Sequence, residues 1–256
     1  MRPNHTKARL LRGEVVVGCA ISSPDPEIVE LLGAAGFDFV RIEGEHGPPD
    51  PSALEHVVRA AEGSNITPAA RVPSIGELLR YLDRGVAAVT VPHVETRADA
   101  EAAVRAAKHF PVGMRGHNSG GRHSRYGFDA LTTREYYDHI NQETLLIALI
   151  ETEAGLHNAA EIAATPGIDM IDIGPSDLAQ SLGLPAKSVV DEAVDRIAAA
   201  ALSAGKPFGV GTTMTLDNPE EMRRWVAKGS RYFLTGASTL FRSAAIDALR
   251  IMADVR

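Results

Sequence analysis

The 256-residue chain lacks the features that mark secreted, membrane and nucleic-acid-binding proteins. Its single cysteine, Cys19, excludes an intramolecular disulfide and suits a reducing cytoplasm. No apolar run reaches the roughly 18 residues of a membrane helix, and we expect no secretory signal. A net charge of −7 without any dense basic run argues against nucleic acid or an anionic membrane as a partner. We therefore expect a cytoplasmic protein whose partners are small molecules.

Short apolar runs alternate with amphipathic Ala/Leu-rich segments, the pattern of a parallel sheet covered by helices. Strands are predicted at residues 15–21, 37–43, 67–71, 87–92, 145–151, 169–174, 207–213 and 231–237. Helices are predicted at residues 26–35, 51–62, 75–83, 97–109, 154–164, 189–204 and 219–228. A ninth weak run at 111–114 is interpreted as loop. Eight strands with intervening helices predict a (β/α)₈ TIM barrel, formed as one domain over residues 1–256.

One long irregular stretch, residues 115–141, separates the fourth and fifth predicted strands and is rich in glycine. A connection of this length is usually functional, or else it is evidence against the assignment of elements. We interpret it as a loop that reaches over or beside the mouth of the barrel. A disordered surface insertion is the alternative.

The strand predicted at 37–43 ends in a turn that presents an acid and a histidine, Glu45 and His46. The carboxyl ends of the strands form the mouth of a barrel, so this turn could aim a general base into it. Arg71 ends the third strand, where a guanidinium could hold a carboxylate or stabilise an oxyanion. An ordinary polar loop and an ion pair at the rim are the respective alternatives.

Two carboxylates follow neighbouring predicted strands. Glu151 ends the apolar run 145–150, and Asp177 comes after Gly174-Pro175-Ser176. Because parallel neighbours lie about 4.8 Å apart, these carboxylates can converge on one hard cation such as Mg²⁺ or Mn²⁺. A rim salt bridge and a helix N-cap are the alternatives. The glycine turn could also direct free N–H groups at a carboxylate or phosphate.

Asp83 ends a predicted helix and could orient a histidine, or it could lie on the surface. A helix C-terminus disfavours a negative charge unless a nearby group compensates it. Besides His46, three histidines, His93, His117 and His123, could reach the mouth and set specificity. A structural or exposed role is the simpler interpretation of these three.

Together these segments resemble the class II pyruvate aldolases of the HpcH/HpaI type, which act on 4-hydroxy-2-oxo acids. The matching blocks, in order, are residues 35–39, 43–47, 71–73, 82–85, 91–92, 115–116, 151–152 and 174–179. The resemblance implies a barrel of the phosphoenolpyruvate/pyruvate type. It also implies a homo-oligomer, usually a hexamer built from dimers that exchange a C-terminal helix. Residues 239–255 could be that helix or simply the closing helix of the barrel.

The resemblance also implies a role for each site residue. Glu151 and Asp177 would hold a divalent metal, Mg²⁺ or Mn²⁺ with Co²⁺ as an alternative, and N–H groups of the turn at 174–177 would receive the carboxylate of pyruvate. Arg71 would stabilise the enolate oxygen. His46, oriented by Asp83, would take part in proton transfer.

The predicted reaction is reversible cleavage of a 4-hydroxy-2-oxo acid to pyruvate and an aldehyde. A cation and an arginine at the ketone oxygen lower the barrier by stabilising the charge of the enolate. No lysine ends a predicted strand, so a Schiff-base aldolase has no evident nucleophile. Oxaloacetate decarboxylation or related chemistry on the same enolate is one alternative, and a non-catalytic 2-oxo acid binding protein is another.

Departures from the family pattern surround the predicted pocket. Glu43 stands where aspartate is common, Leu149 where glutamine is common, and His93 where methionine is common. In the long loop, Tyr126 replaces a frequent tryptophan. Because the proposed metal ligands are unchanged, we expect the pyruvate half of the site to be kept and the aldehyde half to be altered.

Overall fold

The computed structural model describes residues 2–47, 51–129, 131–211 and 219–253, and its strands form one closed parallel barrel. The strands are β1 (Val16–Ile21), β2 (Phe39–Glu43), β3 (Thr67–Arg71), β4 (Ala88–Val91), β5 (Leu145–Ile150), β6 (Met170–Ile173), β7 (Phe208–Val210) and β8 (Tyr232–Gly236). Each strand pairs in parallel with the next, and β8 closes on β1. The predicted (β/α)₈ TIM barrel is confirmed.

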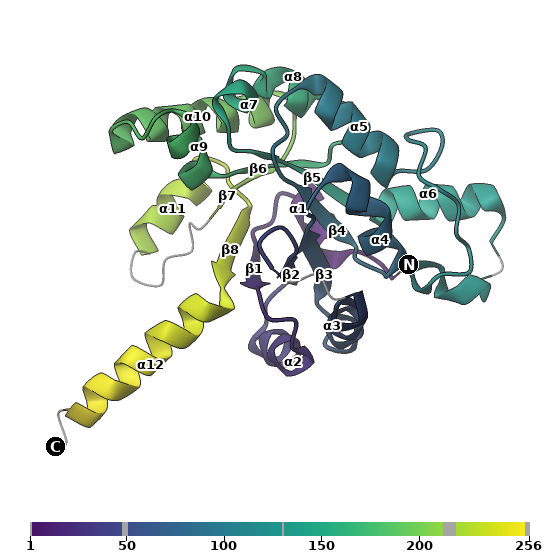
Figure 1. Cartoon of the computed structure of the whole chain (residues 1–256), viewed down its shortest axis with the longest axis horizontal. Helices are drawn as coiled ribbons and strands as arrows, with labels where there is room; N and C mark the ends of the chain where they lie inside the picture. The colour runs from purple at the N-terminus through teal and green to yellow at the C-terminus, as the bar shows by residue number, and fades with distance from the viewer. Residues whose placement is uncertain (1, 48–50, 130, 212–218, 254–256) are drawn as a thin grey trace.

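Helices surround the barrel (Figure 1). They are α1 (His5–Leu11), α2 (Pro26–Ala35), α3 (Pro51–Gly63), η1 (Ile75–Glu77), α4 (Leu78–Asp83), α5 (Arg97–Ala107), η2 (Arg122–Gly127), α6 (Thr133–Glu143), α7 (Glu153–His157), α8 (Ala159–Ala164), α9 (Pro175–Ser181), α10 (Lys187–Ser203), α11 (Pro219–Ala227) and α12 (Ala237–Ala253). The helix predicted at 154–164 is split at Asn158, and α1, α6 and α9 were not predicted. None of the described helices is long and apolar enough to cross a membrane.

Helix α2 shows why many predicted boundaries hold. The side chain of Asp25 accepts a hydrogen bond from the N–H of Glu27, and Pro26 occupies the first turn, where its missing N–H costs nothing. Gly36 ends the helix with a φ of 92°, a conformation that glycine adopts without steric cost. Both signals are local, so the sequence alone sets the bounds of this helix.

The interior of the barrel changes from apolar to polar towards the carboxyl ends of the strands. At the opposite edge, the rings of Phe39 and Tyr232 stack with centroids 4.5 Å apart, and Leu10 of α1 closes the layer. Above them lies a buried ion pair, in which Nη1 of Arg41 is 3.3 Å from Oδ2 of Asp172. Burial raises the pKa of Asp172, and the charge of Arg41 opposes the rise. The layer of the barrel interior next to the mouth is therefore the charged pair Arg41–Asp172 and not a set of apolar side chains.

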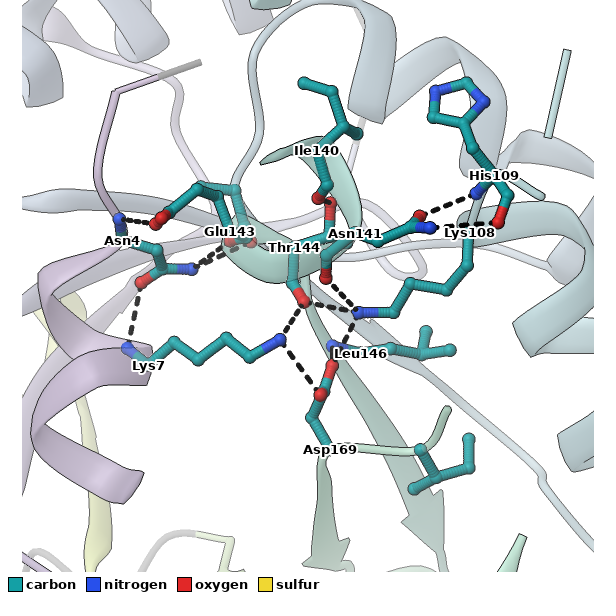
Figure 2. Close-up of polar contacts among 12 residues, drawn as sticks. Asn4, Lys7, Lys108, His109, Ile140, Asn141, Glu143, Thr144, Leu146 and Asp169 are labelled. Atoms are coloured by element: carbon teal, nitrogen blue, oxygen red, sulfur yellow. Dashed lines mark hydrogen bonds and ion pairs between the residues drawn. The ribbon is translucent and has the colours of Figure 1, made fainter. Parts of the chain in front are cut away.

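Two buried lysines, Lys7 of α1 and Lys108 at the end of α5, meet at the edge of the barrel opposite the mouth (Figure 2). Nζ of Lys7 lies 2.9 Å from Oδ1 of Asp169, and Nζ of Lys108 lies 2.8 Å from Oδ2 of the same carboxylate. Both ammonium groups also donate to the carbonyl oxygen of Thr144. Burial lowers the pKa of Lys108 to about 8, against the opposing charge of Asp169. One carboxylate thus compensates two buried cations.

We expect Asp169→Asn to lower the free energy of unfolding at pH 7 by about 3–5 kcal/mol, because it leaves two buried ammonium groups without a counter-charge. Urea denaturation at pH 7 measures the change. Asp195→Asn is the matched control, since the Lys228–Asp195 pair is 33% and 45% exposed and should contribute about 0–1 kcal/mol. Equal effects of the two substitutions would contradict the structural role of Asp169.

The prediction that residues 115–141 form a loop over or beside the mouth is wrong, because this stretch contains η2 and most of α6 and the segment 115–143 lies away from the mouth. Arg115 donates to Asp83 at the end of α4, and Glu143 at the end of α6 accepts from the backbone N–H of Asn4. Buried Tyr136 and Ile140 of α6 anchor the segment to the same side of the barrel. It therefore lies towards the amino ends of the strands. The weak run at 111–114 is loop, as predicted.

The C-terminal helix α12 projects away from the barrel (Figure 1). Ala237 and Leu240 in its first turn pack against the core, and none of the described residues of α12 is buried. Its large exposed hydrophobic residues are Phe241, Ile246, Leu249, Ile251 and Met252. The helix does not fold back over β8 and β1, so it is not an ordinary closing helix of the barrel.

Candidate functional site

Glu43 and Arg71 form a paired centre where β2 and β3 end. The two residues are register partners, and Nε and Nη2 of Arg71 lie 2.8 Å and 2.7 Å from Oε2 of Glu43. Oε1 of Glu43 also accepts from the N–H groups of Glu45 and His46, which fixes the turn after β2. Burial alone would raise the pKa of Glu43, but the hydrogen bonds from Arg71 and from this turn lower it. Glu43 is therefore a carboxylate at neutral pH.

Glu45 and His93 extend this centre across the mouth. Oε2 of Glu45 lies 3.2 Å from Nε of Arg71, yet accepts no hydrogen bond, because that N–H points at Glu43. Oε1 of Glu45 lies 3.3 Å from Nε2 of His93, which follows β4. Nε and Nη2 make the hydrogen bonds and ion pairs of Arg71, and Nη1 forms none with the described residues. One guanidinium edge thus stays available to a ligand.

Glu151, directly after β5, is buried beside His93 and Gly174. Its Oε1 accepts from the backbone N–H of His93 at 3.0 Å. A Cβ atom at position 174 would lie 2.8 Å from both Cβ and Oε2 of Glu151, so only glycine fits there. Burial raises the pKa of Glu151, and the charges of Asp177 and Glu45 raise it further. The charge of Asp177 therefore acts on Glu151, although the burial of Glu151 is the larger cause of the raised pKa.

We expect Gly174→Ala to weaken the binding of a divalent metal by about 10–100-fold, because the methyl group displaces the carboxylate of Glu151. Isothermal titration of the chelated protein with Mn²⁺ measures the affinity. Gly63→Ala is the control, since a Cβ atom there meets nothing within 4 Å. Unchanged affinity in Gly174→Ala would show that Oε2 of Glu151 does not face the cation.

The turn that Gly174 opens leads into α9, whose first turn contains Ser176 and Asp177. Both residues are exposed, and their N–H groups donate to no described residue. Free N–H groups at such a turn can bind an anion. The predicted substrate turn and the predicted metal ligand Glu151 are thus brought together by the contact of Gly174 with Glu151.

The charges at the mouth suit a divalent cation. Glu43, Glu45, Glu151 and Asp177 are opposed by the single guanidinium of Arg71, so the cluster is about three negative charges in excess. No group of three or more His, Cys, Asp or Glu side chains arranged for a metal occurs among the described residues. A cation held by Glu151 and Asp177 would therefore complete its shell with water and substrate oxygens, as Mg²⁺ and Mn²⁺ do.

The structure does not bring Asp83 to His46 within one chain. His46 lies at the mouth with its side chain 67% exposed, and Glu45, with Oε2 4.0 Å from Nε2, is the carboxylate beside it. Asp83 binds Arg115 and Asn118 instead. The reason is topological: the helix after a barrel strand runs back towards the amino ends of the strands, so the end of α4 lies opposite the mouth.

The sequence gives no site role to Glu43 and indicates Glu45 only as the acid beside His46 in the turn after the second strand. It indicates His93 only as a residue that could reach the mouth, and it does not predict the pair Arg41–Asp172. The available signal for that pair was a charged residue inside each of two otherwise apolar runs, Arg41 before Ile42 and Asp172 between Ile171 and Ile173. For His93 the signal was its place directly after a strand, opposite an acid that follows another strand. His117 and His123 lie away from the mouth, where they pack on Tyr136.

Comparison with known proteins identifies the family. The HpcH/HpaI aldolase/citrate lyase family model matches residues 17–240. The curated 5-keto-4-deoxy-D-glucarate aldolases of Shigella dysenteriae and Escherichia coli are 35% identical over 248 residues, and the match covers 94% of this chain and of each of these relatives. This chain is therefore similar to an aldolase over nearly its whole length.

Comparison with solved structures supports the same family assignment. A HpcH/HpaI aldolase/citrate lyase family protein from Burkholderia cenocepacia superposes with a TM-score of 0.87 at 29% identity, covering 98% of this chain and 99% of that one. The citrate synthase SbnG gives a TM-score of 0.83 at 31% identity, covering 97% and 98%. The family model and the curated relatives bear out the aldolase activity that the sequence predicts. The chain belongs to the HpcH/HpaI aldolase/citrate lyase family.

Proposed function

We propose that the mouth of the barrel cleaves a 4-hydroxy-2-oxo acid into pyruvate and an aldehyde, and catalyses the reverse condensation. The observation that carries this proposal is the buried Glu151, held by Gly174 and His93 next to the charge of Asp177. Burying a carboxylate among like charges is costly, and a divalent cation would remove that cost. When bound there, the cation stabilises the negative charge that develops on the keto oxygen.

The residues around the proposed cation site have separate tasks. The N–H groups of Ser176 and Asp177 would bind the substrate carboxylate. The unpaired Nη1 of Arg71 would donate to the keto oxygen, where charge accumulates in the enolate. His46 would accept the C4 hydroxyl proton as the C3–C4 bond breaks and its electron pair moves to the ketone. A proton added to C3 completes pyruvate.

Mg²⁺ and Mn²⁺ both suit a site of two carboxylates, and we propose one of them, with Co²⁺ as an alternative. A structural relative, the citrate lyase β subunit from M. tuberculosis, has been solved with oxaloacetate and magnesium, and at 20% identity it shares the fold.

The test follows pyruvate directly. In D₂O, an enolate-forming enzyme exchanges the methyl protons of pyruvate for deuterium, which proton NMR detects without any aldehyde. We expect exchange with Mg²⁺ or Mn²⁺, its loss on addition of a chelator, and pyruvate consumption when an aldehyde is added. Chelated protein that exchanges as fast as metal-loaded protein would falsify the proposal.

We also propose that the chain works as a homo-oligomer in the cytoplasm, a hexamer by resemblance. Exposed apolar residues along α12, such as Phe241 and Leu249, support a subunit contact through this helix. An orienting role of Asp83 on His46 would then require a neighbouring subunit. Light scattering on the intact chain and on the Phe241→Asp/Leu249→Asp variant tests this, and equal masses would count against contact through α12.

A further inference from the structure

His93 has a backbone conformation that few non-glycine residues adopt. Its φ is 52°, and such a left-handed residue costs of the order of 1–3 kcal/mol unless its surroundings hold it. Here the backbone N–H is held by Oε1 of Glu151 at 3.0 Å. The same hydrogen bond fixes the position of the His93 backbone, from which the imidazole side chain extends. The ring therefore lies beside the proposed metal ligand for a definite structural reason.

The imidazole lies between two carboxylates and is open to solvent. Nδ1 lies 3.4 Å from Oε1 of Glu151, and Nε2 lies 3.3 Å from Oε1 of Glu45. The His93 side chain is 57% exposed, whereas that of Glu45 is 14% exposed. Neither ring nitrogen makes a hydrogen bond of good geometry with the described residues. Nε2 and Oε1 of Glu45 thus present a donor and an acceptor side by side at the mouth.

A hydroxyl group matches this pair better than other substituents do. It donates to Oε1 of Glu45 and accepts from Nε2–H of His93. A carboxylate has no proton to give, and it would meet Glu43, Glu45 and Glu151. A methyl group would leave the polar pair desolvated without partners, which costs about 1–3 kcal/mol.

We propose that Glu45 and His93 form the aldehyde half of the site and select an uncharged hydroxyaldehyde. This inference rests on the proposed aldolase function and specifies its acceptor. The sequence predicts that the aldehyde half of the site is altered, and His93, which departs from the family pattern, would account for that alteration. His93 and Glu45 are then specificity-determining residues.

Three aldehydes of matched size test the proposal. Glycolaldehyde, acetaldehyde and glyoxylate carry a hydroxymethyl, a methyl and a carboxylate group on the reacting carbon. With saturating pyruvate and Mn²⁺, we expect kcat/KM for glycolaldehyde to exceed the other two by at least about tenfold. His93→Asn keeps a residue type that tolerates positive φ but is too short to reach Glu45. It should lower the glycolaldehyde/acetaldehyde ratio about tenfold, mainly through KM.

Glu45→Gln removes one negative charge and should raise the glyoxylate/glycolaldehyde ratio about tenfold. His56→Asn, on the exposed face of α3, is the control and should leave both ratios unchanged. If the wild type exchanges pyruvate protons yet prefers acetaldehyde or glyoxylate, the acceptor assignment is overturned while the aldolase function stands. An equal loss of kcat/KM on all three aldehydes in His93→Asn also overturns the acceptor assignment. Absence of pyruvate exchange overturns both proposals.

Discussion

Glu151→Gln should bind no divalent metal and lose about 10³-fold or more in kcat/KM, while the chelated protein remains at least as stable as the wild type. Glutamine keeps an oxygen that can accept from the N–H of His93, so the local fold is preserved. What it removes is a buried charge that sits among like charges and whose pKa is raised for that reason. Loss of function without loss of stability is the signature of a residue retained for its chemistry. Asp177→Asn should likewise lose metal binding and lower kcat/KM.

The measurements are isothermal titration with Mn²⁺, pyruvate proton exchange, and thermal unfolding in the presence of a chelator. Glu153→Gln is the matched control, because Glu153 lies two residues away on α7 and is exposed. It should retain both metal binding and exchange. Metal affinity within about threefold of wild type in Glu151→Gln would remove this residue from the metal site, whatever happens to the rate.

The sequence predicts the barrel well because its signals are local and repeated. Apolar runs such as 145–150 are buried on both faces, and caps such as Asp25 with Gly36 set helix ends without help from distant residues. The position of the segment 115–143 could not be obtained in this way. It depends on the partners of Arg115 and Glu143, which are distant in sequence. Polar composition indicates a loop but not the edge of the barrel that it covers.

Only those site residues whose place follows from barrel topology can be predicted from the sequence. Residues that end a strand or directly follow one, such as Arg71 and Glu151, lie at the mouth because the carboxyl ends of the barrel strands form it. Asp83 ends a helix, so the same topology places it at the opposite edge, and only resemblance had paired it with His46. The left-handed φ of His93 has only a weak local sequence signal, because histidine is enriched at positive φ but adopts it in a small minority of cases. Its backbone N–H donates to Glu151, a contact that only the assembled barrel provides.

Arg71→Gln should lower kcat/KM by about 10²–10³-fold and the free energy of unfolding by about 3 kcal/mol. The guanidinium compensates Glu43 and Glu45, whose side chains are only 9% and 14% exposed. Removing one partner of a buried pair leaves the other charge uncompensated. The double variant Arg71→Gln/Glu43→Gln should regain about 2 kcal/mol but no activity, because the donor Nη1 is still missing.

The stability cost of Arg71→Gln should depend on pH in a defined direction. The folded chain lowers the pKa of Glu43 through Arg71, so the pair contributes its full stability above the ordinary carboxyl pKa of 4.5. That contribution disappears as the pH falls through the lowered value, because Glu43 then takes up a proton. Urea denaturation of wild type and variant from pH 7 to pH 3 should show the difference shrinking below about pH 4.5. Arg80→Gln is the control, since Arg80 pairs with Glu77 on the exposed surface and should change stability by less than about 1 kcal/mol. A cost independent of pH would mean that Arg71 stabilises the mouth through packing rather than through its charge.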